Sequence, residues 1–189
     1  MLKKLVTVIV VNWNGKQHLE DCFSSLLKQD YPALEIIMVD NASNDGSVEF
    51  AKKKFSSIKI IKNQINIGFG PAVNKGMAIG KGEYLLFLNN DISLEPDCIS
   101  KLTKSMEISD IGGAIPKILF FDKRDVINSF GVDVNYVGIA CPRFIYEKDS
   151  ESLKEEEVPC GGIFMFHRNI LKKVRGFDES IFFYHEDHD

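Results

Sequence analysis

Short apolar runs and helical periods alternate through the first half of the chain. The apolar runs are rich in Val, Ile and Leu, which is typical of strands that are covered on both faces of a sheet. The pattern predicts strands at Leu5–Val11, Leu34–Asp40, Ile58–Ile61 and Glu83–Leu88.

Between these runs, apolar residues recur at the spacing of one helical face. The first such period consists of Leu19, Cys22, Phe23, Leu26 and Leu27. Further helices are predicted at Ser47–Lys54 with Ser47 as the N-cap, from Gly70-Pro71, from Pro96, and at Arg168–Val174. Strands and helices in alternation indicate right-handed βαβ units and a parallel sheet, so the predicted fold class is α/β.

The pattern changes after Gly112. The apolar pieces become shorter, and polar stretches separate them; these pieces are Ala114–Phe121, Ile127–Phe130 and Ile163–Phe166. The strongly acidic stretch Asp149–Glu157 is typical of a solvated loop. The second half of the chain therefore has a different organisation from the first.

The composition fits one globular domain. The chain has 189 residues, of which 44% are apolar and 26% are charged, enough for a single sizeable core. Its net charge of -4 is unlike that of proteins that bind nucleic-acid phosphates, so no nucleic-acid partner is expected.

Cysteine spacing and the N-terminal segment bear on the compartment. The cysteines form no C-x-x-C pair, which disfavours a zinc site or a redox motif; they are Cys22, Cys98, Cys141 and Cys160. Reduced thiols and a cytoplasmic location are the simplest interpretation. The apolar run Leu5–Val11 is much shorter than a membrane span, and no signal-peptide cleavage site follows it. We therefore expect a soluble chain.

Polar residues collect where the predicted strands end. These exits are Asn12-Trp13-Asn14, Asp40-Asn41, Asn63–Gly68 and Asn89-Asn90-Asp91. In an open parallel sheet, ligands bind beyond the carboxyl ends of the strands. Turn chemistry is the preferred explanation for Asn41, Asn44 and Asp45, and packing beside the first helix is preferred for Trp13. The four exits together favour a shared polar ligand.

Two common nucleotide-binding motifs are missing at these exits. No G-x-G-x-x-G pattern follows the first strand, and Gly80-Lys81-Gly82 lacks the rest of a P-loop. Ordinary NAD(P) and P-loop chemistry are therefore disfavoured. Asp91 has the oxygen ligands that Mg²⁺ or Mn²⁺ prefers, but an Asx turn toward the Pro96 helix explains it equally well. The residues alone leave both interpretations open.

Five segments, in order along the chain, resemble the motifs of glycosyltransferase family 2. They are Val10–Gly15 (VVNWNG), Val39–Ser47 (VDNASNDGS), Asn66–Gly70 (NIGFG) with Ala72 and Asn74, Leu88–Asp91 (LNND), and Gly176–Glu179 (GFDE) with Tyr184 and Glu186-Asp187. The likeness is greatest to rhamnosyltransferase-like bacterial and archaeal members.

The resemblance implies the GT-A fold. In that fold a Rossmann-like, mostly parallel central sheet is flanked by helices and accompanied by a smaller sheet region on the acceptor side. We expect one domain over 1–189, with a nucleotide-binding half at 1–111 and an acceptor-side half at 112–189. Family members usually continue past the E-D motif, so the chain is expected to be truncated at its C-terminus.

The resemblance also implies roles for individual residues. Nucleotide-sugar contacts are implied for Val11, Asn12, Asn14, Asp40, Asn66, Gly68, Asn74, Asn89, Asn90, Gly161 and Gly162. Asn89-Asn90-Asp91 stands at the family's D-x-D motif, with Asn89 in place of the first aspartate. Asp91 would hold Mg²⁺ or Mn²⁺ at the donor diphosphate. Glu186-Asp187 resembles the family's catalytic E-D motif, with Asp187 as the base.

These roles predict an inverting glycosyltransferase, since one base without a covalent nucleophile implies inversion. The donor would be a UDP-, dTDP- or GDP-sugar, and the acceptor a saccharide or a lipid-linked saccharide in cell-surface polysaccharide synthesis. A lipid-linked acceptor would bring the protein to the inner face of the membrane as a peripheral contact. The alternative is a non-catalytic nucleotide-sugar-binding or scaffold domain of the same fold. A sugar-nucleotide pyrophosphorylase is disfavoured, because its first loop would be rich in Gly and carry Arg.

Overall fold

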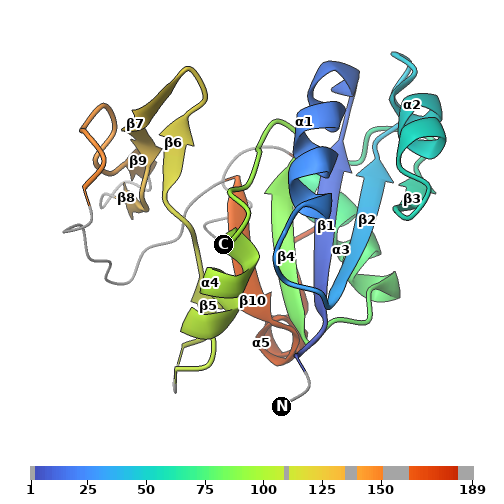
Figure 1. The fold of residues 1–189 in the computed structure, drawn as a ribbon. Coiled ribbons are helices and arrows are strands. Elements are labelled where there is room, and N and C mark those ends of the chain that lie inside the picture. The colour runs from blue at the N-terminus through green and yellow to red at the C-terminus, as the bar shows by residue number, and fades with distance from the viewer. Residues whose placement is uncertain (1–2, 109–110, 135–139, 151–161, 183–189) are drawn as a thin grey trace.

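A six-stranded sheet forms the centre of the protein in the computed structural model, which describes residues 3–108, 111–134, 140–150 and 162–182 (Figure 1). The strand order is β3-β2-β1-β4-β10-β5. The strands are β1 (Val6–Asn12), β2 (Leu34–Asp40), β3 (Lys59–Lys62), β4 (Tyr84–Asn89), β5 (Gly113–Ala114) and β10 (Ile163–His167). The predicted α/β class is confirmed.

The first four strands run parallel, and β10 enters antiparallel beside β4. The chain builds the sheet outward from β1 through β2 to β3 and then returns to place β4 on the other side of β1. The order therefore reverses between β1 and β4. In open α/β sheets a crevice forms at this switch point, outside the carboxyl ends of the strands.

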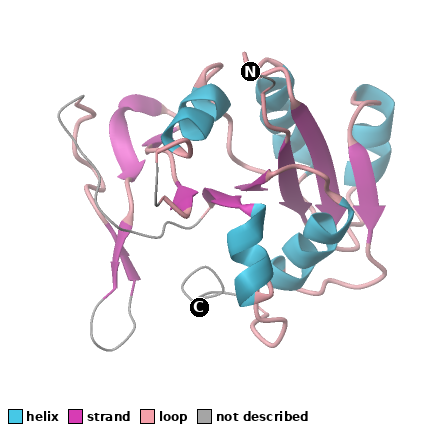
Figure 2. Ribbon diagram, turned by 90° about the horizontal axis from the view of Figure 1, so that it is seen from below, coloured by secondary structure: helices cyan, strands magenta, loops and turns pink. Residues whose placement is uncertain are grey.

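Helices cover both faces of the sheet (Figures 1 and 2). One face packs against α1 (Lys16–Leu27), α2 (Ser47–Lys54) and α4 (Cys98–Ser105), and the other against α3 (Phe69–Ile79) and α5 (Arg168–Val174). In β1, Val8 faces the first layer and Ile9 the second, and both are fully buried. Burial on both faces explains why the central strands read as continuous apolar runs.

The smaller sheet region stands apart from the central sheet (Figure 1). It consists of two antiparallel pairs, β6 (Ile118–Phe120) with β7 (Lys123–Ser129) and β8 (Val132–Val134) with β9 (Ala140–Pro142). The ion pair between Arg124 and Glu95, 3.7 Å apart, connects β7 to the loop that follows β4.

Two helix starts differ from the sequence prediction. Ser47 is the first residue of α2, not its cap; Gly46 takes the cap position with a φ of 81°, and the Ser47 N–H donates to Asp45 Oδ1 at 3.0 Å. Helix α4 begins at Cys98, after a turn at Pro96. Ile99 and Leu102 of this helix, and Met106 just after it, are buried against the sheet.

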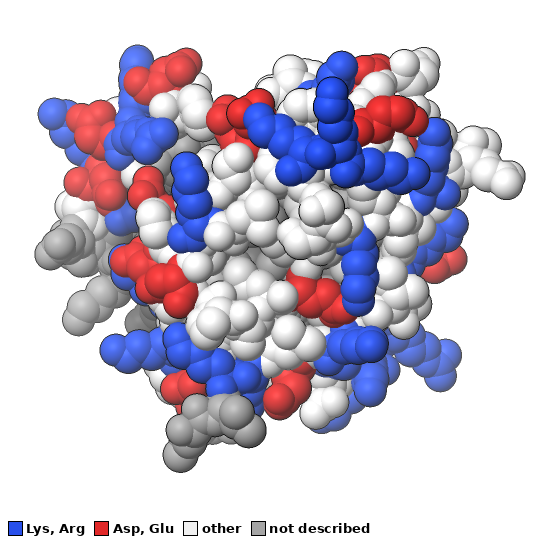
Figure 3. Space-filling model, turned by 45° about the vertical axis from the view of Figure 1, so that its right-hand side comes forward, with Lys and Arg blue, Asp and Glu red and all other residues white. Residues whose placement is uncertain are grey.

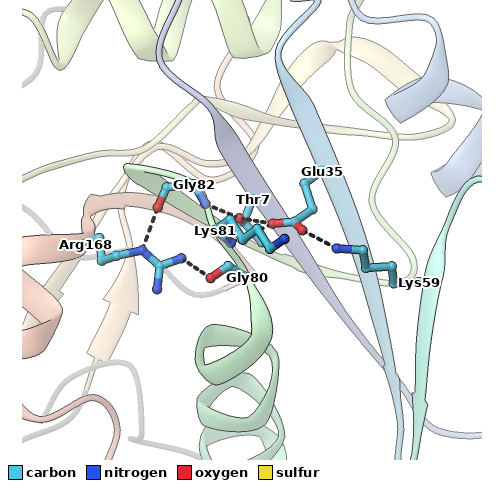
Figure 4. Close-up of polar contacts among 7 residues, drawn as sticks. All are labelled: Thr7, Glu35, Lys59, Gly80, Lys81, Gly82 and Arg168. Atoms are coloured by element: carbon cyan, nitrogen blue, oxygen red, sulfur yellow. Dashed lines mark hydrogen bonds and ion pairs between the residues drawn. The ribbon is translucent and has the colours of Figure 1, made fainter.

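At the amino end of the sheet, polar contacts hold the α3–β4 connection (Figure 4). Glu35 accepts hydrogen bonds from Thr7 Oγ1 at 2.7 Å, from the Lys81 N–H at 2.7 Å and from Lys59 Nζ at 2.5 Å. Arg168 donates to the carbonyls of Gly82 at 2.6 Å, Gly80 at 2.9 Å and Met77 at 3.1 Å. The guanidinium therefore satisfies carbonyls at the C-terminal end of α3, where such groups lack helical partners.

Charges of both signs mix on the face shown in Figure 3, with an uncharged area between them. Ion pairs such as Lys54–Glu20 and Lys59–Glu35 join opposite charges from different elements. On this face, basic side chains are therefore interspersed with acidic ones.

Candidate active site at the carboxyl edge of the sheet

A row of side chains crosses the switch point between β4, β1 and β2. Asn90 Nδ2 donates to Asn12 Oδ1 at 2.6 Å, and Asn12 Nδ2 donates to Asp40 Oδ1 at 2.8 Å. Asn12 and Asp40 are fully buried, whereas Asn90 is half-buried. The sequence predicted that the strand exits would meet, and the structure brings these three together.

Asp40 is the fixed point of this row. Its carboxylate also accepts from the Ser43 N–H at 3.0 Å and from Ser43 Oγ at 2.5 Å. A buried carboxylate needs such donors, because burial without them disfavours its charge. Ser43 was not predicted as a site residue; the signal in the sequence is the Asp-x-x-Ser spacing, which lets the aspartate accept the backbone N–H three residues later.

The loop after β1 is tied to the loop after β2. The Asn14 N–H donates to Ser43 Oγ at 2.9 Å, and Asn14 Oδ1 accepts from the Asn44 N–H at 2.9 Å. Asn14 has a φ of 49°, in the left-handed region where Asn is among the better-tolerated residues. Trp13 is 58% exposed, so the packing expected for it is wrong. Turn chemistry for Asn44 stays a prediction, because this contact uses its backbone N–H.

Gly15 allows the Asn90 side chain to reach Asn12. A Cβ atom at Gly15 would lie 2.0 Å from Asn90 Nδ2 and 3.0 Å from Asn12 Oδ1. A real Cβ cannot approach so closely, so any side chain at this position would displace the Asn90 amide. Gly15 was not predicted as a site residue.

A second buried network lies at the exits of β2 and β3. Asn41 Nδ2 donates to the Gly68 carbonyl at 2.9 Å, and Asn41 Oδ1 accepts from Asn63 Nδ2 at 2.8 Å. Lys75 Nζ donates to Asn63 Oδ1 at 2.7 Å. Asn41 and Asn63 are 2% and 4% exposed, so turn chemistry is the wrong explanation for Asn41. Its amide holds the loop that precedes α3.

That loop carries two residues, Asn66 and Gly68, that were predicted to contact the sugar-nucleotide. Asn66 Oδ1 accepts from the Gly68 N–H at 3.0 Å. Gly68 has a φ of 87° and a ψ of 175° immediately before α3, a backbone conformation that is largely confined to glycine. Hydrogen bonds therefore fix the peptide groups on both sides of Gly68.

The exit of β4 faces the start of β10. The Asn89 N–H donates to the Gly162 carbonyl at 2.9 Å, and Gly162 has a φ of 93°. Val11, half-buried near the end of β1, is the register partner of Asn89. Asn89, Gly162 and Val11 thus lie at the same edge of the sheet as Asn12.

Asp91 is exposed just beyond this edge. Within the described ranges, no group of three or more His, Cys, Asp or Glu side chains is arranged to hold a metal ion. Mg²⁺ and Mn²⁺ sites that serve phosphate substrates often use one or two carboxylates, with phosphate and water oxygens as the remaining ligands. The exposed Asp91 carboxylate at this edge fits a metal of that kind.

Asn74 was also predicted to contact the sugar-nucleotide, but its side chain is bound to another part of the protein. It lies in α3, and its amide group makes hydrogen bonds to the main chain of Phe177. Three further predicted site residues, Gly161, Glu186 and Asp187, lie outside the described residues.

With this geometry in place, comparison with known proteins gives the family. The model of the family "Glycosyl transferase family 2" matches residues 7–175. The chain belongs to glycosyl transferase family 2. The resemblance inferred from the five sequence segments is therefore confirmed; its rhamnosyltransferase-like subtype stays a prediction.

Relatives within the family match only part of their own length. An uncharacterized glycosyltransferase of Haemophilus influenzae is 34% identical over 109 residues, which cover 56% of this chain and 34% of the relative. Glycosyltransferase GlyG of Streptococcus pneumoniae is 27% identical over 127 residues, which cover 66% and 42%. The chain thus spans less than half the length of either family relative.

Solved glycosyltransferase structures share the fold. S. aureus TarS 1–349 has a TM-score of 0.71 at 19% identity, over 97% of this chain and 53% of that one. The mannosyltransferase PcManGT from Pyrobaculum calidifontis, solved in complex with GDP-Man and Mn²⁺, has a TM-score of 0.68 at 18% identity, over 95% and 49%. The predicted GT-A fold is confirmed. No helix in the described part of this family member is long and apolar enough to cross a membrane.

Proposed function

We propose that this chain binds a nucleotide-diphospho-sugar at the carboxyl edge of its sheet and transfers the sugar, with inversion, to a saccharide or lipid-linked acceptor. The row Asn90–Asn12–Asp40 carries the proposal, because it fixes the strand exits and the half-buried Asn90 at the switch point where sheets of this kind bind nucleotides. Membership of the family supports the reaction class.

In this proposal the nucleoside lies over the exits of β1 and β2. Val11 and Asn14 line the base, while Asn12 and Asp40, which are fully buried and hydrogen-bonded to each other, support the strand exits beneath the base and the ribose. Because Asp40 is already held by Asn12 and Ser43, it is preorganised and pays little to order itself on binding. Asn66, Gly68, Asn89 and Asn90 would continue the site along the sugar-nucleotide, with Gly161 and Gly162 toward the donor sugar and the acceptor.

Asp91 is proposed to hold Mg²⁺ or Mn²⁺ together with the donor diphosphate. When bound, the ion offsets negative charge on the departing nucleoside diphosphate. The protein would supply one carboxylate on the loop after β4, next to the polar row. The observation that PcManGT was solved with GDP-Man and Mn²⁺ supports a metal of this type in the fold.

Asp187 is proposed as the general base, with Glu186 beside it. A carboxylate that accepts the proton of the acceptor hydroxyl makes that oxygen nucleophilic, and such a base contributes about 10²–10⁴ in rate. A direct attack opposite the leaving group inverts the anomeric centre. Phe182, which precedes this motif in the sequence, lies against Gly68 at the N-terminus of α3, and this contact supports assigning the motif to the same site as the donor loop.

The biological setting is proposed from the family resemblance. Residues 1–111 would form the nucleotide-binding half and 112–189 the acceptor-side half of one domain. The donor would be a UDP-, dTDP- or GDP-sugar and the product a cell-surface polysaccharide or glycan, made at the cytoplasmic face of the membrane. TarS has been solved with UDP and with UDP-GlcNAc, which supports a nucleotide-sugar donor.

Thermal unfolding with UDP, dTDP and GDP, with and without Mn²⁺, tests the donor site. A nucleotide at about 100 times its Kd adds about 2.7 kcal/mol to the stability. The variant Asp91→Ala should lose the part of the shift that depends on Mn²⁺, whereas Glu107→Ala, at an exposed acid in the turn after α4, should keep it. A melt that none of the nucleotides shifts would refute the donor site.

Turnover separates the enzyme from a non-catalytic domain. Release of nucleotide from the sugar donor is expected from the wild-type protein and should be lost in Asp187→Asn, with nucleotide binding retained. Nucleotide binding without any release would favour the non-catalytic nucleotide-sugar-binding domain.

A further inference from the structure

Helix α3 packs against the segment 176–182, which follows α5, and Asn74 makes hydrogen bonds across this contact. Asn74 Oδ1 accepts from the Phe177 N–H at 3.0 Å, and Asn74 Nδ2 donates to the Phe177 carbonyl at 2.9 Å. The same Nδ2 donates to Glu179 Oε1 at 3.2 Å. One side-chain amide thus pairs with both main-chain groups of a residue 103 positions away.

Glycines on both sides of the contact allow this approach. A Cβ at Gly176 would lie 2.5 Å from Asn74 Oδ1, and one at Gly70 would lie 3.0 Å from Phe177 Cβ. At the start of the helix, a Cβ at Gly68 would lie 2.4 Å from the Phe182 carbonyl oxygen. The segment 176–182 therefore runs beside the N-terminal half of α3, so close that side chains at these glycines would clash.

Aromatic packing also fixes the same segment against α3 and the sheet. The Phe177 ring makes edge-to-face contacts with Phe69, at 6.4 Å between centroids, and with Phe87, at 5.4 Å. Phe87 is fully buried in β4. The hydrogen bonds of Asn74 and this ring cluster together give the segment one position on the sheet.

We infer that Asn74 is a positioning residue for catalysis and not a donor ligand. Both N–H hydrogens and the oxygen of its amide already make hydrogen bonds to 177–179. A nucleotide sugar could bind to this amide only by displacing these partners. The segment that it holds leads directly to Glu186-Asp187. This inference rests on the proposed function, in which Asp187 is the base.

The contact between α3 and the segment 176–182 also connects the donor loop with the part of the chain that precedes the proposed base. Gly68 is held on one side by Asn41 and lies on the other against Phe182. The donor loop 66–68 and the chain toward the base thus share α3 as their support. Loosening the Asn74 contact should disturb catalysis while leaving nucleotide binding in place.

The experiment compares wild-type protein with Asn74→Ala, using UDP-GlcNAc and GDP-mannose with Mn²⁺ as donor probes and water as the acceptor. We expect the Kd of the bound donor to stay within about twofold. The kcat for nucleotide release should fall about 10²-fold, the effect of misplacing a catalytic group by about 1 Å. Amide hydrogen exchange at 177–182 should become faster, without any ligand present.

Further variants separate positioning from general damage. Gly176→Ala introduces a Cβ against Asn74 Oδ1 at a φ of 81°, and should reproduce the loss of kcat although glycine has no side chain to bind a donor. Asn74→Asp keeps the acceptor for the Phe177 N–H but turns a carboxylate oxygen toward the Phe177 carbonyl and Glu179, so the loss of kcat should be at least as large as in Asn74→Ala. Asn169→Ala, an exposed asparagine on α5, is the matched control and should change nothing.

The outcomes are distinct. A donor Kd weakened tenfold or more with kcat intact would make Asn74 a donor ligand and overturn the inference. Unchanged kcat and unchanged exchange at 177–182 in Asn74→Ala and Gly176→Ala would overturn it as well. If the wild-type protein binds neither of these nucleotide sugars and does not bind dTDP either, the proposed function itself fails, and the inference fails with it.

Discussion

Glu35 supplies the sharpest test of how the amino end of the sheet is held, through the substitution Glu35→Gln. The side chain is 10% exposed and accepts three hydrogen bonds, from Thr7 and Lys81 on one oxygen and from Lys59 on the other. Glutamine offers one acceptor oxygen and one amino group. Whichever way the amide turns, its amino group faces a hydrogen-bond donor, either Lys59 or the pair Thr7 and Lys81, and cannot accept from it.

The size of the effect follows from which contacts are lost. Hydrogen bonds to a charged group contribute about 1.5–3 kcal/mol each. Lys59 is 51% exposed, so solvent screens its ion pair and the contacts with Thr7 and Lys81 dominate. Glutamine can turn its oxygen toward Thr7 and Lys81, but a neutral amide accepts these hydrogen bonds more weakly than a carboxylate, by about 1 kcal/mol each, and its amino group then faces Lys59. We therefore expect Glu35→Gln to destabilise the fold by about 2–4 kcal/mol. At about 2–4 °C per kcal/mol for a domain of this size, the Tm should fall by about 4–16 °C.

The loss should depend on pH. Burial raises the pKa of Glu35, but the hydrogen bonds from Lys59, the Lys81 N–H and Thr7 outweigh it, so the net pKa is lowered. A carboxyl whose pKa is lower in the folded state stabilises the fold above its unfolded pKa, about 4.3. This stabilisation disappears as the pH falls through the folded pKa. The difference between wild type and Glu35→Gln should therefore be constant from pH 7 to about 5 and shrink below pH 4.

Urea unfolding at a series of pH values measures both quantities. Glu83→Gln is the control, because the Glu83 side chain is 63% exposed and should cost less than about 0.5 kcal/mol. A Glu35→Gln protein as stable as wild type at pH 7 would refute the reasoning. So would a destabilisation that stays the same down to pH 3.

Two further predictions concern the site and its support. Gly15→Ala should break the 2.6 Å contact between Asn90 and Asn12, and calorimetry should find nucleotide affinity lowered about tenfold with the Tm changed by only a few degrees; unaltered affinity would show that the contact is not part of the site. Arg168→Met removes three hydrogen bonds to carbonyls at the end of α3 and in the α3–β4 connection, and should cost about 2–4 kcal/mol in urea unfolding. Arg168→Lys should recover only part of this, because an ammonium group cannot reach three carbonyls in the fork geometry of a guanidinium; full recovery by lysine would contradict that explanation.

Much of the central sheet is predictable because its signals are local. Strands that are buried on both faces must be apolar throughout, and β2 was predicted with the bounds that the structure gives. Helix α5 was also predicted with its observed bounds. The parallel arrangement brings every carboxyl end to one edge, so the meeting of Asn12, Asp40 and Asn90 could be expected from their places after strands.

Residues with more than one local use were harder to interpret. Asn41 occupies a position where asparagine suits a turn, and nothing nearby in the sequence indicates burial. Its partners Gly68 and Asn63 come from positions 27 and 22 residues away. Trp13 was expected to pack, as large apolar side chains usually do, yet it is exposed beside the site. Only the arrangement of neighbouring elements distinguishes these cases.

The sequence by itself determined the α/β class, the main strands and helices, the family and the edge at which polar groups gather, because each depends on periodicity or on motifs within short segments. The tertiary structure decided what those motifs touch. The antiparallel entry of β10 beside β4 and the pairing of Asn74 with Phe177 join segments that are far apart in the chain. No local pattern specifies such contacts, since they arise only when packing has brought both backbones within hydrogen-bonding distance.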